Sequence, residues 1–284
     1  MFNSIHLCSR FFILILTNVH TIKCNFIKNK NMKTKLILVM TLSIFFSYAQ
    51  LKPIDYKDGD QKLSGFLSKP AKALKTKSGI LILPAWMGID DHAKESAVEL
   101  SKLGYYTFVA DIYGVGNKPT NFSEAGQKAG YFKKNSKEYQ KRIQLALDQL
   151  IAQGTNPNEI VVMGYCFGGT GAIEAARSNM KVKGIVSFHG GLARDETSVI
   201  DSISPRVLVL HGADDPYESE TEIKAFQNEM RNANADWEMV YYSNAVHSFT
   251  DKSAGSDNSK GAAYNEKADK RSWKAMLQFL KEVL

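Results

Sequence analysis

The sequence predicts an α/β fold in which a mainly parallel sheet of about seven or eight strands carries helices on both faces. Strand-like and helix-like segments alternate from Lys62 to the C-terminus, which is typical of parallel strands joined by covering helices. Some strand-like segments are continuous apolar runs, such as Gly79–Leu83, as expected for strands buried on both faces. No repeat or linker interrupts the pattern, so we predict one domain over residues 50–284.

The first half of this domain is predicted from apolar alternation, apolar runs and helical spacing. Lys62–Ser68 alternates apolar and polar residues and predicts a half-exposed strand, followed by a solvated lysine-rich connection. His92 is expected to cap the first helix, and Gly104 to end it. The predicted elements are strands Lys62–Ser68, Gly79–Leu83 and Tyr105–Ala110, helix His92–Leu103, and a helix whose apolar face is Ile143, Ala146, Leu147, Leu150 and Ile151.

The second half repeats the alternation of strands and helices. The predicted strands are Ile160–Tyr165, Val182–His189, Arg206–Gly212 and Trp237–Tyr242. The predicted helices are Gly169–Asn179, Glu218–Ala233 and a final helix with Trp273, Met276, Leu277, Leu280 and Leu284 on one face. In folds of this kind the working residues lie in loops beyond the C-terminal ends of the strands. Candidate residues are therefore sought there.

The excess of positive charge is confined to the N-terminus. The chain has 36 Lys and Arg against 29 Asp and Glu, a net charge of +7, but residues 1–49 hold six of the basic residues and no acidic one. The remainder therefore carries a net charge of only +1. This even balance argues against a nucleic-acid partner.

The N-terminal segment has the pattern of a secretory signal. From Met32 the chain shows two lysines, an apolar run over Leu36–Phe46, and then Ser47-Tyr48-Ala49. Small residues at the third and first positions before a cut suit signal peptidase. We predict cleavage after Ala49, export to the periplasm or the medium, and no membrane span in the mature chain, with Met32 as the true start and residues 1–31 as an upstream extension. An uncleaved anchor is the alternative, although the run is shorter than the ~18 residues that spanning requires.

Cys166 is the candidate nucleophile. Cys8 and Cys24 lie in the predicted leader, which leaves the mature chain one thiol, either an inert buried residue or a working one. The segment Gly164–Gly169 reads GYCFGG between a predicted strand and a helix, and it matches the G-x-nucleophile-x-G turn with Cys in place of Ser. Its glycines leave room where strand and helix backbones approach. The N-terminus of the helix favours a thiolate.

An acid and a histidine follow at later strand ends. Asp214 and Asp215 come directly after a buried strand. Asp215 is favoured because the acid usually follows the strand-end glycine by three residues; the alternative is that both aspartates cap the turn before Pro216. His247 is the one histidine of the predicted mature chain that follows this acid. The order nucleophile, acid, histidine is that of the α/β-hydrolases.

Two backbone N–H groups are candidates for an oxyanion hole. In an α/β-hydrolase one comes from the residue after the nucleophile, here Phe167, and the other from the loop after the third strand, here Trp86. For Trp86 the alternative is a surface-loop aromatic residue. His189 and Tyr165 are candidates for lining the pocket, since both lie at strand ends. The sequence shows neither a metal-ligand cluster nor a glycine-rich phosphate loop, so no cofactor is predicted.

The chain resembles the dienelactone hydrolase (carboxymethylenebutenolidase) family over nearly the whole predicted mature chain. The matching segments are LPAWMGIDDH at 83–92, ADIYG at 110–114, GYCFGG at 164–169, HGADDP at 211–216 and AVHSF at 245–249. The resemblance implies a triad of Cys166, Asp215 and His247. Two positions depart from the best-known members: Ala85 replaces a glutamate that helps activate the thiol, and Thr250-Asp251-Lys252 replaces an arginine that holds a substrate carboxylate.

These observations predict an exported hydrolase that cleaves a small ester or lactone through a thioester intermediate. Dienelactone itself is disfavoured, because Asp251 would repel an anionic substrate. A carbohydrate-ester or thioester hydrolase is an alternative enzyme. A non-catalytic binding protein or a redox-responsive thiol protein on the same fold is an alternative outside that class. The sequence does not indicate an oligomeric state.

Overall fold

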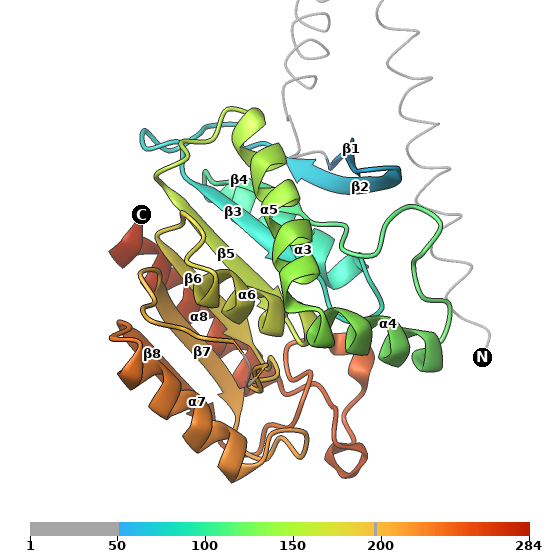
Figure 1. The fold of residues 1–284 in the computed structure, drawn as a ribbon, viewed down its shortest axis with the longest axis vertical. Coiled ribbons are helices and arrows are strands. Elements are labelled where there is room, and N and C mark those ends of the chain that lie inside the picture. Colours follow the sequence, from blue (N-terminus) through green and yellow to red (C-terminus); the bar gives the residue numbers. More distant parts are fainter. Residues whose placement is uncertain (1–50, 196–197) are drawn as a thin grey trace, which may run out of the picture. The chain divides into compact units, whose positions relative to one another are not determined.

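A mostly parallel sheet forms the centre of the computed structural model, which describes residues 51–195 and 198–284. Its eight strands are arranged in the order β1-β2-β4-β3-β5-β6-β7-β8 (Figure 1). The strands are β1 (Lys52–Asp58), β2 (Gln61–Ser68), β3 (Gly79–Leu83), β4 (Tyr106–Val109), β5 (Ile160–Tyr165), β6 (Gly184–Phe188), β7 (Arg206–Gly212) and β8 (Trp237–Tyr242). Only the β1–β2 and β2–β4 pairs are antiparallel, which confirms the predicted fold class. The predicted leader, residues 1–49, lies outside the described residues.

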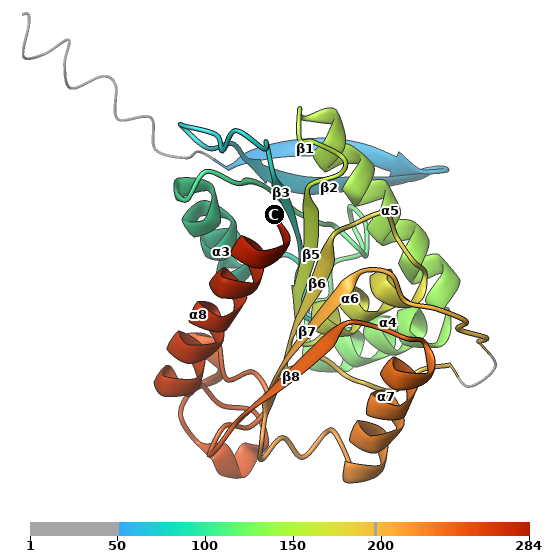
Figure 2. The same ribbon diagram turned by 90° about the vertical axis from the view of Figure 1, so that its left-hand side faces the viewer.

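Helices cover both faces of the sheet, as predicted. They are α3 (Asp91–Lys102), α4 (Phe122–Lys134), α5 (Ser136–Ala152), α6 (Phe167–Arg177), α7 (Glu220–Asn232) and α8 (Glu266–Val283). Figure 2 shows α3 and α8 on one face and α4 to α7 on the other. Among the residues that the structure describes, no helix combines the length and the apolar character needed to cross a bilayer.

The alternation of side chains along β3 explains why both faces need cover. Ile80 and Ile82 pack into a core with α3 and α8, whereas Leu81 and Leu83 pack into a second core with α5 and α6. All five residues of this strand are buried. A strand with apolar residues on both sides is stable only between two helical layers, so the sequence pattern and the observed architecture agree.

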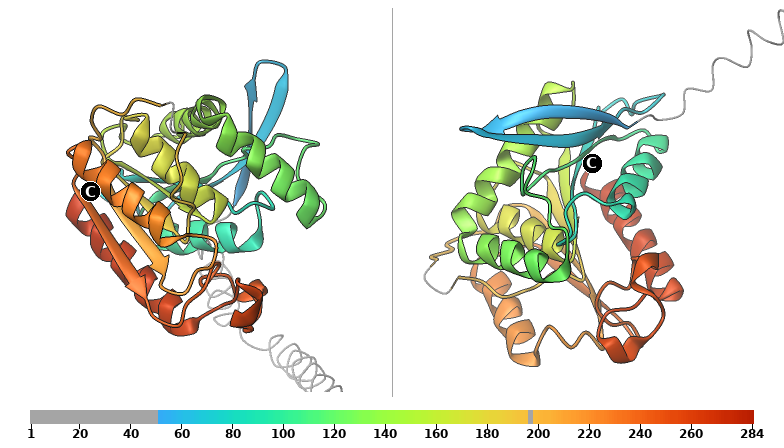
Figure 3. Two further views of the ribbon diagram at one scale, coloured as in Figure 1. Left: turned by 60° about the horizontal axis from the view of Figure 1, so that its bottom comes forward. Right: turned by 90° about the vertical axis from the view of Figure 1, so that its right-hand side faces the viewer.

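The sequence analysis did not predict the strand β1 or the helix α4, and it assigned the wrong residue as the cap of α3. The strand β1 pairs with β2 in a hairpin at the edge of the sheet (Figure 3), and only one of its residues is buried. The helix α4 contains two glycines, Gly126 and Gly130, and a weak apolar repeat. The cap of α3 is Asp90, whose side chain accepts the Ala93 N–H. His92 lies inside the first turn instead, because a carboxylate satisfies a free helical N–H better than an imidazole does.

The register of the parallel strands brings the candidate loops to one edge. Leu83 is opposite Gly164, Tyr165 is opposite Phe188, and Phe188 is opposite Leu210. The loops after β3, β5, β6 and β7 therefore start side by side, although long stretches of chain separate them. This edge is where the candidate site lies.

Candidate active site

Cys166 occupies a strained turn between β5 and α6. Its backbone has φ 53° and ψ −114°, a conformation that costs a non-glycine residue about 1–3 kcal/mol. The flanking glycines are required by space: a methyl group on Gly164 would clash with the carbonyl of Gly168, and one on Gly168 would clash with the carbonyl of Leu83. Strand, turn and helix backbones thus touch directly, and the half-buried Cys166 is presented at the strand end.

The three residues predicted to work together form one chain of hydrogen bonds. His247 Nε2 lies 3.0 Å from Cys166 Sγ, and His247 Nδ1 lies 2.8 Å from Asp215 Oδ2. The other carboxylate oxygen of Asp215 accepts the Tyr217 N–H at 3.0 Å. Asp215 is buried, whereas Asp214 is exposed. Of the two candidate acids, the structure therefore brings Asp215 to the imidazole.

The electrostatics of this chain favour a thiolate–imidazolium pair. Burial raises the pKa of the Cys166 thiol, but the charge of His247 and the hydrogen bonds to the sulfur outweigh it, so that pKa lies below its usual value. Burial lowers the pKa of His247, yet the Cys166 thiolate and the Asp215 carboxylate together raise it to about 10. The lowered pKa of the thiol and the raised pKa of the imidazole both shift the shared proton from the sulfur toward the imidazole.

The two predicted oxyanion donors are held by local contacts. The Phe167 N–H faces the sulfur and contributes to lowering the pKa of Cys166. The Phe167 ring is stacked between those of Tyr139 and Tyr113, at centroid distances of 4.6 and 5.6 Å. In the β3 loop, the Gly88 N–H donates to the carbonyl of Ala85 at 2.9 Å. This turn fixes the peptide that carries the Trp86 N–H, because carbonyl and N–H of one peptide are rigidly opposed.

The structure buries both residues predicted to line the pocket, Tyr165 and His189. Each is only 2 % exposed. The Tyr165 hydroxyl shares a hydrogen bond with Ser96 at 2.9 Å, and His189 Nδ1 accepts the Cys166 N–H at 3.1 Å. Both residues were predicted to line the pocket; His189 contacts the main chain of Cys166, but both side chains are buried and line no open surface here.

Sequence reasoning missed two titratable residues that lie beside Gly191, Lys133 and Glu218. The ammonium group of Lys133 and a carboxylate oxygen of Glu218 both reach Gly191. They lie 3.2 and 3.3 Å from the point where a methyl group on this glycine would be. The charge of Lys133 helps to lower the pKa of Cys166. Burial raises the pKa of Glu218 to about 7. Lys133 lies on α4, which the sequence did not predict, whereas the position of Glu218 just after the acid loop was a usable signal.

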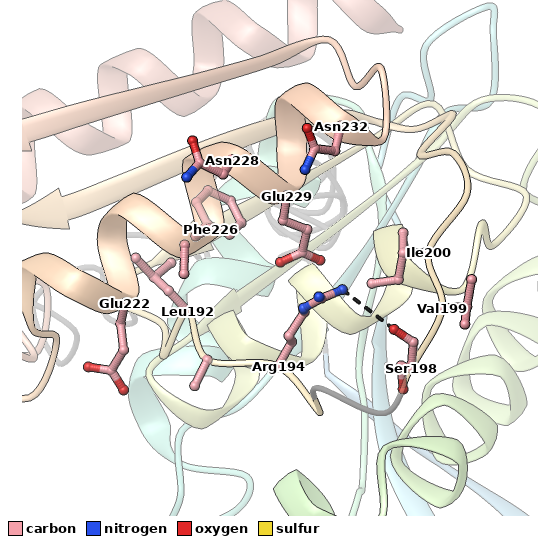
Figure 4. Close-up of a pocket in the computed structure, with 12 residues that line it drawn as sticks. Leu192, Arg194, Ser198, Val199, Ile200, Glu222, Phe226, Asn228, Glu229 and Asn232 are labelled. Carbon is pink, nitrogen blue, oxygen red and sulfur yellow. Dashed lines mark hydrogen bonds between the residues drawn. The ribbon is translucent and has the colours of Figure 1, made fainter.

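Two cavities in the part of the chain that the structure describes lie outside this chain of residues. The larger, about 850 Å³, lies between the loop after β6 and α7, and Arg194, Phe226 and Glu229 are on its wall (Figure 4). The second, about 620 Å³, is lined mainly by α3, the segment Thr250–Ser253 and α8. Within residues 51–195 and 198–284, no group of three or more His, Cys, Asp or Glu side chains could hold a metal ion.

Comparison with known proteins identifies the family. The model of the dienelactone hydrolase family matches residues 63–284. The chain belongs to this family. It is therefore a hydrolase of the dienelactone hydrolase type with the α/β-hydrolase fold, as the five sequence motifs predicted.

Three relatives illustrate the range of the family. A solved structure, a dienelactone hydrolase-like promiscuous phosphotriesterase from metagenomic libraries, is 34 % identical with a TM-score of 0.78 and covers 82 % of this chain and 98 % of its own. A Caenorhabditis elegans protein without a stated function is 33 % identical over 144 residues, which is 50 % of this chain and 91 % of the relative. A Yersinia pestis protein to which carboxymethylenebutenolidase activity is ascribed is 24 % identical over 202 residues, 67 % of this chain and 75 % of the relative.

Proposed function

We propose that this hydrolase cleaves small lactones and activated esters, with Cys166 as the nucleophile, His247 as the general base and acid, and Asp215 as the residue that orients His247. The observation that carries the proposal is the unbroken chain from Sγ through the imidazole to the carboxylate, at 3.0 and 2.8 Å. Nucleophile and base within hydrogen-bond reach, with the base held by a third group, are the requirements for covalent catalysis.

In the first half of the reaction the Cys166 thiolate attacks the ester carbonyl carbon. The Phe167 and Trp86 N–H groups stabilise the resulting oxyanion, each by about 3 kcal/mol. When the intermediate collapses, the bond to the alcohol oxygen breaks, and the His247 imidazolium gives that oxygen its proton. The products are the alcohol, or the opened end of a lactone, and a thioester on Cys166.

In the second half a water molecule replaces the alcohol. Neutral His247 removes a proton from the water, the hydroxide attacks the thioester carbonyl, and the C–S bond breaks to return the thiolate. A thiolate leaves more readily than an amine, so a tetrahedral intermediate formed from an amide reverts to substrate. This chemistry favours lactones and activated esters over peptides.

The two departures from the best-known members fit this proposal. Without a glutamate at Ala85, Cys166 depends on a standing ion pair with His247, and the raised His247 pKa supports one. Asp251 lies in the segment where the best-known members carry an arginine. Here it caps a short 3-10 turn by accepting the Ser253 N–H at 2.8 Å. No arginine therefore stands at that position to hold a substrate carboxylate, so dienelactone is not the proposed substrate.

A trapped acyl-enzyme tests the proposal. We expect p-nitrophenyl butyrate and a simple δ-lactone to be hydrolysed, with one acyl group found by mass spectrometry on the peptide that contains Cys166 after acid quenching. Cys166→Ala should show neither turnover nor adduct. Hydrolysis that persists in Cys166→Ala, or that survives complete alkylation of Cys166, would contradict the proposed nucleophile.

The same assay separates the alternatives. A carbohydrate ester, an acyl thioester and a phosphotriester belong in the substrate panel, the last because one relative is described as a promiscuous phosphotriesterase. A kcat/KM at least about tenfold higher for the carbohydrate ester or the thioester would replace the lactone assignment. A thiol that alkylates slowly, together with no turnover of any substrate, would favour a non-catalytic protein.

Export remains part of the proposal and rests on the pattern of residues 32–49. We expect the full chain, expressed in a bacterial host, to yield a periplasmic protein whose N-terminal residue is Gln50. Ala49→Lys should block the cut, because signal peptidase requires a small residue there. An uncut protein that stays in the membrane fraction would show that the segment is an anchor.

A further inference from the structure

The main-chain N–H of Cys166 is held by an unusual partner. It donates to the carbonyl of Phe188 at 3.0 Å and also to His189 Nδ1 at 3.1 Å. His189 has a φ of 39°, so this histidine, like Cys166, is kept in a region that side chains disfavour. Two strained residues from neighbouring strand ends therefore hold each other.

A chain of hydrogen bonds continues from His189 away from the nucleophile. His189 Nε2 lies 2.8 Å from Thr250 Oγ1, and the same oxygen lies 3.2 Å from His92 Nε2. The Cys166 N–H requires an unprotonated Nδ1, and Thr250 supplies the acceptor that a proton on the buried Nε2 needs, so the two contacts together place the proton of the neutral ring on Nε2. The Thr250 hydroxyl is then free to donate to His92. Each link determines the proton position of the next.

His189 is suited to remain neutral beside a charged His247. It is 2 % exposed, and Thr250 is 3 % exposed. Burial, followed by the positive charge of His247, keeps the pKa of His189 well below its usual value. The two imidazole rings meet edge to face with centroids 5.3 Å apart. A proton on His189 Nδ1 would point at the Cys166 N–H, and a second positive charge would disfavour the His247 imidazolium.

We propose that His189 is a positioning residue for the nucleophile, held in one tautomer by Thr250 and His92, and that this chain fixes the Cys166 turn so that its sulfur meets His247. The inference rests on Cys166 being the nucleophile. The chain joins the turn after β5, the end of β6, the segment after His247 and the first turn of α3. These four segments carry or flank the predicted site. The Thr250 hydroxyl, which contacts both His189 and His92, therefore helps to keep them in place relative to one another.

A simple packing role makes a different prediction. If Thr250 only fills space, valine should replace it with little effect, because valine has nearly the same shape and carries a methyl group in place of the hydroxyl. If the hydroxyl orders the tautomer of His189, valine should disturb the turn and serine should preserve it. Reactivity at Cys166 and the position of the His189 proton can both be measured without any substrate, so failure of the proposed ester hydrolysis would not be confused with failure of this chain.

Thr250→Val, Thr250→Ser and the exposed control Thr221→Val test the proposal. In the wild type, ¹⁵N-histidine NMR should show His189 as a neutral ring protonated on Nε2 throughout the neutral and mildly alkaline pH range. Thr250→Val should lose this single tautomer, and its Cys166 should react with iodoacetamide about tenfold more slowly. Thr250→Ser and Thr221→Val should stay within about twofold of wild type. For a cleaved ester, kcat should fall in Thr250→Val with little change in KM.

Either of two results overturns the proposal. One is a wild-type His189 that carries its proton on Nδ1 or becomes charged in that pH range, and this result needs no variant to fold. The other is a folded Thr250→Val protein with unchanged tautomer and unchanged alkylation rate. Equal melting temperatures of Thr250→Val and Thr250→Ser would show that a lost rate is not lost stability.

Discussion

Asp215→Asn is expected to lower kcat/KM for ester hydrolysis by about 10⁴-fold, because the amide removes the charge that supports the His247 imidazolium and offers an N–H where Nδ1 needs an acceptor. Asp214→Asn is the matched control. Asp214 is the preceding residue in the same loop, but it is exposed and makes no contact with His247 among the described interactions. We expect its kcat/KM to stay within about twofold of wild type.

The pH dependence of Cys166 alkylation gives the same test without a substrate. In the wild type the thiol pKa is lowered, so the rate should reach its plateau at a lower pH than for an ordinary thiol and fall as pH drops through that lowered pKa. In Asp215→Asn the pKa of His247 should fall from about 10, which removes the imidazolium and moves the rise in rate toward the ordinary thiol range. An Asp215→Asn profile that matches the wild type, or equal losses of activity in both asparagine variants, would contradict the assigned acid.

Gly164→Ala is expected to lower the free energy of unfolding by about 3 kcal/mol or more. The added methyl group would clash with backbone atoms of Gly168 and Gly169, and backbone in a turn between a buried strand and a buried helix has nowhere to move. Urea denaturation at constant m-value measures the change.

Gly130→Ala provides the control for this prediction. Gly130 lies in α4, and a methyl group there would meet nothing within 4 Å. Alanine in a helix interior is favoured over glycine by up to about 1 kcal/mol, so this variant should be as stable as the wild type or more so. A Gly164→Ala protein within about 0.5 kcal/mol of wild type would show that the turn can relax. It would then weaken the argument that glycine is required there.

The buried strands were predictable because a strand that is buried on both faces is a continuous apolar run in the sequence. Gly79–Leu83 and Ile160–Tyr165 are apolar throughout, and every residue of each is buried. The edge strand Lys52–Asp58 shows no such apolar run, since Tyr56 is its only buried residue. Its pairing with β2 comes from main-chain hydrogen bonds, which depend little on the identity of the side chains.

The helix α4 was missed for a related reason. Its buried face consists of Ala125, Ala129 and Phe132, two of which are too small to produce a clear apolar repeat. Two glycines within it also lower the intrinsic helix propensity. Packing against α5 and the core stabilises it instead, and packing partners are not visible in a local window. Lys133 was missed with it.

For the candidate site, too, the sequence predicted the positions of residues along the chain, and the tertiary structure determined their contacts. The sequence by itself determined which residues lie at strand ends, because apolar runs mark the strands and parallel strands point their C-terminal ends the same way. Only the tertiary structure decided which of these residues meet: Cys166 and His247 are 81 positions apart, and His92 and Thr250 are 158 apart. Hydrogen bonds between such distant residues depend on strand order and loop packing. Those are properties of the whole chain, and no short segment encodes them.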